Sequence, residues 1–277
     1  MKLDFDALRK RRLFFCAPLY GNVMQYGFHV SVSKLGLMCA KNGIHAGEKY
    51  VGCDSLVPRA RNRLAHLFLD TDCTDLLFVD SDIQFEPEDA LSLLQLEEDI
   101  VGGIYSRKQV DWGRIKRAVN VGIPPERLPP FGTVPVLNWL GPVEGIAIDR
   151  LFEVKHMGTG FLRIRRPVFE RMIEFYGESI QFDYHSDEPH FGGRVGYDFF
   201  RAGVDQRYPI GSGKRQYLSE DWAFCERARE CGFKIWAAPW VKLTHSGVYD
   251  YVNDFRVFDH DALLVPEEDP SRGVMMP

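Results

Sequence analysis

The first hundred residues alternate short apolar runs with longer amphipathic segments, and this alternation leaves few possible architectures. The pattern is typical of an α/β protein, in which helices cover a mainly parallel sheet. Turn-forming residues such as Pro18 and the pair Asn42-Gly43 separate the segments. We expect strands over residues 13–18, 44–51, 76–79 and 99–104, and helices over residues 25–41, 58–69 and 87–96. The N-terminal half is therefore predicted to be Rossmann-like.

The second half of the chain has a weaker, mixed pattern. Residues 105–154 hold six of the 16 prolines and are predicted to be irregular, with a hairpin around 134–148. Further strands are expected over 160–164, 233–238 and 241–244. Helices are expected over 167–176 and from the capping residue Ser219 to Glu230, and a long loop is expected over 183–216. We predict a single α/β domain over 1–277, with one half over 13–105, a second half over 155–248 and a tail over 249–277.

Charge and cysteine usage narrow the possible partners and compartments. The net charge of −5 argues against a nucleic-acid binder with a large basic surface, although a local basic patch remains possible. No apolar run approaches the roughly 18 residues of a membrane span, and the N-terminus makes a poor signal peptide. The six cysteines form no C-x-x-C pair, which indicates reduced thiols. We expect a cytoplasmic protein, and the sequence leaves its oligomeric state open.

Two aspartates follow the most apolar of the expected strands. Leu76–Val79 is a continuous apolar run, as in a strand buried on both faces, and it leads into Asp80 and Asp82. Residues two apart in an extended chain point the same way, so both carboxylates are expected at the carboxyl end of the sheet. A divalent cation, Mg²⁺ or Mn²⁺, would satisfy them and could bridge to a diphosphate. Alternatively, they only cap the turn before Pro87.

Several stretches of the chain resemble one enzyme family. The segment LLFVDSDIQFEPEDALSLL looks like the D-x-D segment of nucleotide-sugar glycosyltransferases with the GT-A fold. Five other stretches resemble further segments of the same family and occur in the family's order. They are LFFCAPLYG, ARNRLAHLFL, DIVGGIYSRK, GTGFLRIRRPVFERM and LSEDWAFCERARECGFKIWAAPWVKLTHSG. The resemblance implies a GT-A-like single domain with a mixed, mainly parallel central sheet flanked by helices. Residues 13–105 would then form its nucleotide-binding half and residues 155–248 its acceptor-side half.

The resemblance also implies a set of donor-binding residues. Asp82 would coordinate the metal, and Asp80 would contact the donor ribose or reach the metal through water. His245 in KLTHSG would complete the coordination, although a lone histidine is more often structural. Pro18 and Tyr20 match the turn that holds the nucleotide base and ribose, where Tyr20 could also be an ordinary aromatic at a strand end. Ser81, inside the triplet, is predicted to contact the nucleotide.

Basic residues supply candidate partners for the diphosphate. Arg61 lies on the apolar side of the expected helix 58–69, where an unpaired guanidinium would be expensive to bury. A diphosphate would satisfy it, and so would a salt bridge to a core carboxylate. Asn62 beside it and Lys108 are weaker candidates. The glycines of Gly158-Thr159-Gly160 are expected to let backbone approach a ligand closely.

Glu220 and Asp221 resemble the acidic motif on the acceptor side of such enzymes. They open the helix that follows Ser219, where acidic residues also complement the helix dipole without any further role. If the reaction inverts the sugar anomer, Asp221 is the candidate base and Glu220 positions the acceptor. If the anomer is retained, the leaving diphosphate can take the proton and Asp221 only orients the acceptor.

The predicted function is therefore metal-dependent transfer of a hexose or pentose. The donor is a nucleotide-diphosphate sugar, with UDP favoured and GDP possible, and the acceptor is a hydroxyl of a glycan or glycoprotein. A non-catalytic module that binds nucleotide-sugars or glycans is the alternative. A haloacid-dehalogenase-type phosphatase also starts with D-x-D, but here Ile83-Gln84 follow the triplet and the chain has no Gly-Asp dipeptide.

Overall fold

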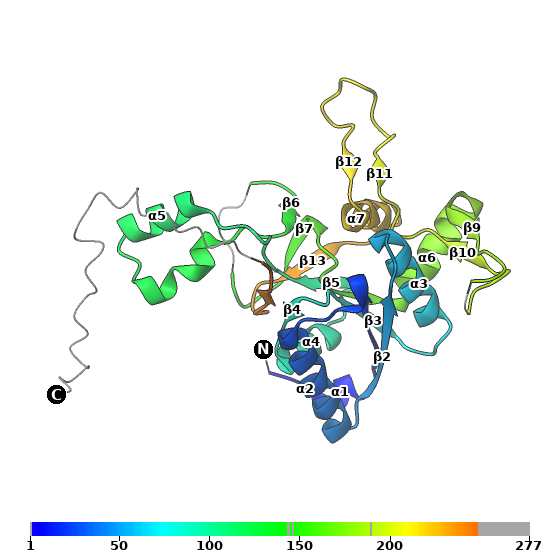
Figure 1. Cartoon of the computed structure of the whole chain (residues 1–277), viewed down its shortest axis with the longest axis horizontal. Helices are drawn as coiled ribbons and strands as arrows, with labels where there is room; N and C mark the ends of the chain where they lie inside the picture. Colours follow the sequence, from blue (N-terminus) through cyan, green and yellow to red (C-terminus); the bar gives the residue numbers. More distant parts are fainter. Residues whose placement is uncertain (1, 143–144, 146, 189, 249–277) are drawn as a thin grey trace. The chain divides into compact units, whose positions relative to one another are not determined.

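We describe the protein from a computed structural model, which covers residues 2–142, 145, 147–188 and 190–248. By its internal contacts the chain divides into two units, residues 1–246 and 247–277, and all the elements below lie in the first. The α/β class, with a large mixed sheet flanked by helices, is confirmed (Figure 1). The tail predicted over 249–277 lies outside the described residues. In the part of the chain that is described, no helix combines the length and apolarity needed to cross a membrane.

The elements follow one another in the order that their numbers give. The helices are α1 (Phe5–Leu8), α2 (Tyr26–Asn42), α3 (Val57–Leu69), α4 (Pro87–Leu94), α5 (Trp112–Asn120), α6 (Arg166–Tyr176) and α7 (Glu220–Glu230). Short 3-10 helices are η1 (Tyr20–Asn22), η2 (Pro125–Arg127), η3 (Pro129–Gly132) and η4 (Gly177–Ile180). The strands are β1 (Arg12–Leu19), β2 (His45–Gly52), β3 (Asp75–Val79), β4 (Ile83–Gln84), β5 (Ile100–Gly103), β6 (Leu137–Trp139), β7 (Phe152–Met157), β8 (Phe161–Arg165), β9 (Gln181–Asp183), β10 (Val195–Tyr197), β11 (Gly203–Val204), β12 (Tyr217–Leu218), β13 (Ile235–Ala238) and β14 (Thr244–His245).

The central sheet has the strand order β2-β1-β3-β8-β5-β13-β7-β6. The pairs β1–β2, β1–β3 and β5–β13 are parallel, and β8 and β7 run against their neighbours. The sheet is therefore mixed but mainly parallel, as predicted. Because β1, β2 and β3 are parallel neighbours, their carboxyl ends meet at one edge of the sheet.

Strand β3 lies at the centre of the core and explains why its sequence is a continuous apolar run. Leu76 and Phe78 pack into one core cluster, together with side chains of α3, α6 and α7. Leu77 and Val79 pack into the other, with side chains of α2 and α4. Each face of the sheet is thus covered by helices (Figure 1). A strand with two covered faces needs apolar residues at every position.

Element boundaries differ from the predictions mainly in the second half. The region predicted to be irregular contains α5, which has nine residues, β6 and the first part of β7, which pairs with β6. The hairpin expected around 134–148 is thus wider, because its second strand begins at Phe152, and residues 143, 144 and 146 lie outside the described chain. The loop expected over 183–216 contains β10 and β11. The last strand falls at Thr244–His245, later than the predicted 241–244.

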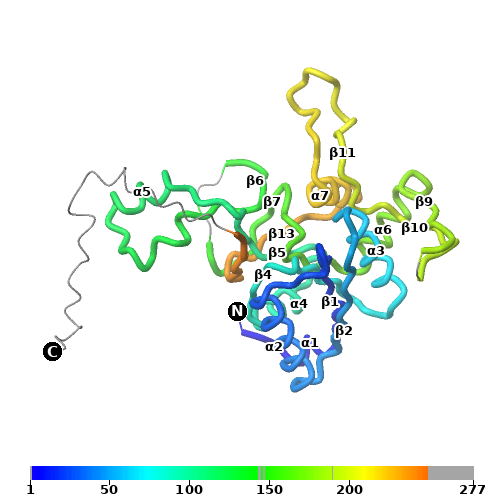
Figure 2. The backbone as a smooth tube through the Cα atoms, in the orientation of Figure 1, coloured from blue at the N-terminus to red at the C-terminus, as the bar shows by residue number. Residues whose placement is uncertain are grey.

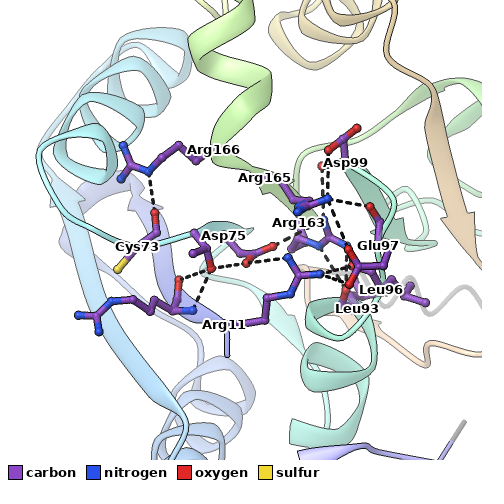
Figure 3. Close-up of polar contacts among 12 residues, drawn as sticks. Arg11, Cys73, Asp75, Leu93, Leu96, Glu97, Asp99, Arg163, Arg165 and Arg166 are labelled. Atoms are coloured by element: carbon purple, nitrogen blue, oxygen red, sulfur yellow. Dashed lines mark hydrogen bonds and ion pairs between the residues drawn. The ribbon is translucent and has the colours of Figure 1, made fainter. Parts of the chain in front are cut away.

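A buried arginine connects the sheet to the end of a helix (Figure 3). It lies at the edge where β3 and β5 begin, opposite the edge with the predicted site. Arg163 of β8 is fully buried, and its guanidinium donates to the backbone carbonyl oxygens of Leu93, Leu96 and Glu98, at the end of α4 and just beyond. Its Nη1 lies 3.6 Å from Oδ1 of the fully buried Asp75. Arginine donors thus add hydrogen bonds to carbonyl groups at and beyond a helix end, where the regular helical donors are missing.

His66 anchors the segment around β9 and β10 to α3. Its ring is buried, with Nδ1 2.5 Å from the Tyr184 hydroxyl, and Nε2 accepts a hydrogen bond of 2.8 Å from the Tyr197 backbone N–H. Burial, and then the positive charge of Arg194, lowers the pKa of His66 to about 4. Protonation of Nε2 would break the bond to Tyr197, so the fold requires the neutral ring.

Stability is therefore expected to fall as the pH is lowered from about 6.5 towards 4. In that window the unfolded state binds the proton that folded His66 rejects, so the loss reaches about 2 kcal/mol at pH 5. Urea denaturation at pH 7.5 and pH 5, compared with His66→Gln, isolates this contribution from that of other groups. An equal pH dependence in the two proteins would contradict the prediction.

Candidate donor and metal site

A cavity of about 290 Å³ opens at the carboxyl ends of β1, β2 and β3. It lies where ligands bind in open α/β sheets. Its lining includes seven of the residues singled out from the sequence: Pro18, Tyr20, Arg61, Asp80, Ser81, Asp82 and Glu220. Residues from β1, α3, the end of β3 and α7 thus surround one space. Val51 and Asp54, which the sequence analysis did not single out, line it as well.

A small two-stranded sheet brings His245 to Asp82. Strand β14 pairs antiparallel with β4, so that His245 lies opposite Ile83, and Ser246 N–H donates to the Asp82 carbonyl at 2.8 Å. His245 Nε2 then lies 3.2 Å from Asp82 Oδ1. Asp82 and His245, which are predicted to share a cation, are therefore in direct contact. That they bind a cation stays a prediction.

Two basic neighbours, Lys108 and His245, favour the charged form of Asp82. Lys108 Nζ bonds Asp82 Oδ2, the oxygen that His245 does not face. Burial alone would raise the pKa of Asp82, but the contacts with His245 and Lys108 outweigh it and hold the pKa below its usual value. Burial lowers the pKa of His245, whereas Asp82 and the Ser106 carbonyl raise it, and the net pKa lies above the ordinary value. Asp82 is thus an anion at neutral pH.

The tautomer of His245 suits a metal ligand. Its Nδ1 is 2.7 Å from the Ser106 carbonyl oxygen, which can only accept a hydrogen bond, so Nδ1 carries the hydrogen. In the neutral form of His245 the lone pair is then on Nε2, which faces Asp82, and this is the arrangement in which a backbone carbonyl orients a metal-binding histidine. Asp82 Oδ1 is buried and, among the described residues, has no hydrogen-bond partner. One carboxylate oxygen and one imidazole nitrogen fit Mn²⁺ better than Mg²⁺.

The protein donors alone do not complete a metal centre. Within the described residues, no group of three or more His, Cys, Asp or Glu side chains is placed to hold a metal ion. Asp80, the other predicted ligand, directs Oδ1 to Arg61 Nη2 at 2.8 Å. Further positions around a cation at Asp82 and His245 would have to be filled by water or by oxygen atoms of a bound ligand, as is common for Mg²⁺ and Mn²⁺ with phosphates.

Arg61 joins the two acidic parts of the site. It is 3% exposed and pairs with Asp80 and, through Nε at 3.4 Å, with Glu220. Burial would lower the pKa of Arg61, but the charges of Asp80 and Glu220 raise it overall. The salt bridge to carboxylates that was the alternative to a bound diphosphate is thus observed for Arg61. Its Nη1 is nevertheless buried with no hydrogen-bond partner in the described chain, which leaves one donor for a ligand.

Asn62 turns away from the cavity and holds another part of the chain. Its amide nitrogen donates to Asp198 Oδ1 at 2.8 Å, and its oxygen accepts from the Phe200 N–H at 3.1 Å. Asn62 is absent from the cavity lining. Adjacent residues on a helix point about 100° apart, so the neighbour of Arg61 faces a different part of the fold.

Tyr105 occupies the space that Gly158 and Gly160 leave. A Cβ at Gly158 would lie 2.1 Å from the Tyr105 hydroxyl oxygen, and one at Gly160 would lie 2.8 Å from Asp80 Oδ2. The tyrosine hydroxyl accepts a bond from Gly160 N–H at 3.2 Å, and its ring packs edge-on against His245. The prediction that these glycines admit a ligand needs correction, because protein side chains fill the space.

Asp221 and Ser219 are bonded differently from the expectation. Ser219 is the N-cap residue of α7, but its side chain makes no capping bond to the helix backbone. Its hydroxyl contacts Asp221 Oδ1, which also accepts the Trp222 N–H at 2.8 Å. Asp221 is not part of the cavity lining, whereas Glu220 is. The charge of Asp221 still contributes to the raised pKa of Tyr105, after burial and Asp80.

Tyr105 and Ser106 are site residues that the sequence analysis missed. They lie just beyond the end of β5, and β5 runs in the same direction as β3 in the same sheet. Their position at the same edge as Asp80 was the available signal. The contact through the Ser106 carbonyl is made by backbone, which carries no sequence signature.

Comparisons with known proteins give structural likeness only. No protein-family model matches the chain, and a search of curated proteins finds no match either. The chain is similar to the crystal structure of A197 from STIV, with 16% identity, 86% of each chain covered and a TM-score of 0.46. It is similar to GalNAc-T7 with UDP, GalNAc and Mn²⁺, with 10% identity, 85% of this chain and 44% of that one covered and a TM-score of 0.43. A glycosyltransferase involved in glycosylation of the major capsid of PBCV-1 matches with 8% identity, 61% of this chain and 68% of that one covered, and a TM-score of 0.30.

Proposed function

We propose that the protein is a metal-dependent glycosyltransferase that transfers a sugar from a nucleotide-diphosphate donor to a hydroxyl of a glycan or glycoprotein. UDP is the favoured carrier and GDP the second. The observation that carries the proposal is the contact of Asp82 with His245 beside a cavity that Arg61, Asp80 and Glu220 also line or border. A carboxylate, an imidazole and a buried guanidinium together suit a cation with a pyrophosphate.

The donor would be held by groups on three sides of the cavity. Asp82 and His245 would bind Mn²⁺ or Mg²⁺, with Asp80 near it, and the cation when bound neutralises charge on the leaving diphosphate. Arg61 Nη1 and Lys108 would add positive charge beside the phosphates. Pro18, Tyr20 and Ser81 would contact the nucleoside, for which the largely exposed ring of Tyr20 offers a stacking surface.

The acceptor would approach the acidic start of α7. Glu220 bonds Arg61 through Oε1, so its second oxygen can accept from an acceptor hydroxyl and orient it. Asp221 holds Oδ1 on Ser219 and Trp222, which fixes the carboxylate and leaves Oδ2 to take a proton. In an inverting reaction, the acceptor oxygen bonds the anomeric carbon as the bond to the diphosphate breaks, and its proton passes to Asp221. In a retaining reaction, the departing diphosphate would take that proton.

Replacing Asp221 by asparagine is expected to preserve nucleotide binding and remove transfer. The change keeps an acceptor oxygen for Ser219 but removes the base, which costs about 1,000-fold in turnover. Calorimetry of UDP with Mn²⁺ and a transfer assay separate the two effects. Glu230→Gln, at the other end of α7, serves as the matched control and should keep both. Turnover close to that of the unchanged protein would exclude Asp221 as the base.

A panel of UDP- and GDP-sugars with Mn²⁺, read as release of free nucleotide, tests the proposed function. Metal-dependent release with one carrier supports a glycosyltransferase. Metal-dependent binding without release, in the presence of glycan acceptors, would indicate a binding module. Release of phosphate from simple phosphomonoesters would indicate a phosphatase. If no nucleotide-sugar raises the melting temperature with any divalent ion, the proposal fails, because a specific ligand stabilises the state that binds it.

A further inference from the structure

The connection between β5 and β6 folds back on itself as a separate helical arm. The arm consists of residues 106–135 and is closed at its base by the bridge between Ser106 and Pro135. It contains α5, η2 and η3, which Figure 2 shows as an excursion from the sheet strands. Among the described residues, every hydrogen bond of residues 109–132 has its partner within the arm. The arm therefore owes its local structure to its own contacts.

Helix α5 packs only part of its apolar face. Ala118 is buried, and a Cβ at Gly132 would lie 2.9 Å from Ile115, so this part of the face is covered from within the arm. Trp112 and Val119, seven residues apart and hence on one side of the helix, are 64% and 52% exposed. Val121, just past the helix end, is 76% exposed. An exposed tryptophan with valines beside it is an apolar surface that water solvates poorly.

The same arm is basic in an otherwise acidic protein. The chain has a net charge of −5, yet the arm carries six basic and two acidic side chains. The basic ones are Arg107, Lys108, Arg114, Lys116, Arg117 and Arg127. One of the two acids, Asp111, is used as the N-cap of α5. Lys116 and Arg117 are exposed on α5 itself, next to the free side of its apolar face.

We propose that the arm docks on the surface of an anionic lipid bilayer. Anionic headgroups complement the basic side chains, and the interface between headgroups and acyl chains accepts Trp112 and the exposed valines. Tryptophan in particular partitions to this interface. A short amphipathic helix with cations beside a tryptophan matches that environment better than it matches water.

The base of the arm contacts the candidate metal site. Ser106 holds the His245 ring through its carbonyl oxygen, and Lys108 bonds Asp82. Docking of the arm would therefore attach to the bilayer a segment whose base contacts the candidate metal site. The inference goes beyond the proposed reaction, since it needs neither nucleotide nor cation.

Co-sedimentation with vesicles tests the proposal. The vesicles are made of phosphatidylcholine alone or with about one third phosphatidylglycerol, in a buffer without nucleotide or divalent cation. The unchanged protein is expected to sediment with the anionic vesicles only, and to be released at about 0.5 M salt. Lys116→Gln with Arg117→Gln should weaken partitioning about 30-fold, and Trp112→Ser with Val119→Ser should weaken it further without changing the salt dependence.

The hairpin between β11 and β12 provides the matched control. Its Ile210 is 85% exposed, and Lys214 and Arg215 follow on the same hairpin. Ile210→Ser with Lys214→Gln and Arg215→Gln removes similar groups and should leave vesicle binding unchanged. Absence of binding to the anionic vesicles, equal binding to neutral ones, or equal losses in the arm and hairpin variants would each overturn the proposal. Because the test omits nucleotide and metal, its failure would leave the proposed reaction untouched.

Discussion

Replacing Asp82 by alanine is expected to lower the Mn²⁺-dependent affinity for UDP by about 100-fold or more. The change removes the carboxylate that contacts both His245 and Lys108. It also leaves two basic groups without their carboxylate partner beside the cavity. Titration calorimetry of UDP with and without Mn²⁺ measures the metal-dependent part of the affinity directly.

A second variant and a control make this expectation specific. His245→Ala should weaken the same metal-dependent part of the affinity for UDP. The double variant should bind UDP little more weakly than either single variant, because both residues would hold one ion. Asp72→Ala is the matched control, since Asp72 precedes β3 whereas Asp82 follows it, and its side chain is 74% exposed. Undiminished metal-dependent affinity in Asp82→Ala would refute the metal role.

The part of the site that lies close together in sequence could be predicted from residue patterns. The apolar run before Asp80 has one physical explanation, a strand covered on both faces, and β3 has five buried residues. The carboxyl end of such a strand is a ligand-binding edge by the geometry of α/β sheets. Hence Asp80, Ser81 and Asp82 follow from local pattern and a general rule.

Long-range pairings could not be predicted in that way. Arg61 meets Asp80 across 19 residues and Glu220 across 159, and helical periodicity shows only that its side chain is buried. The resemblance to a family, not periodicity, suggested the pairing of His245 with Asp82. No residue pattern encodes the bond from His245 to the Ser106 carbonyl, 139 residues away.

The arm was missed for a related reason. Helix α5 has only nine residues and lies in a region with six prolines. The proline content therefore predicted an irregular region, although the helix has a short amphipathic pattern. Isolated helices of this length are marginal in water. Its helical form depends on the packing of Ile115 and Ala118 within the arm. The residue pattern of a single segment does not show such packing.

Replacing Arg163 by methionine is expected to lower the free energy of unfolding by about 3–5 kcal/mol. Burial lowers the pKa of Arg163 to about 10, so the guanidinium remains charged at neutral pH. Its removal takes away the cationic partner at 3.6 Å from the buried Asp75 carboxylate and leaves only Arg11, at 4.0 Å. It also removes the donors to the Leu93 and Leu96 carbonyls at the end of α4. Urea denaturation at pH 7 measures the loss.

The neighbouring Arg165 separates this effect from a general loss of positive charge. Arg165 lies on the same strand, is 26% exposed in its side chain, and makes ion pairs at 3.5 and 3.7 Å, so Arg165→Met should cost under about 1 kcal/mol. Adding Asp75→Asn to Arg163→Met should recover part of the stability, because it removes a fully buried charge that keeps only Arg11 as an ion-pair partner. Equal losses of unfolding free energy in Arg163→Met and Arg165→Met would show that burial of the pair of Arg163 and Asp75 contributes nothing. Since Arg163 lies at the edge of the sheet opposite Asp82, its loss should leave the affinity for UDP with Mn²⁺ unchanged wherever the protein is still folded.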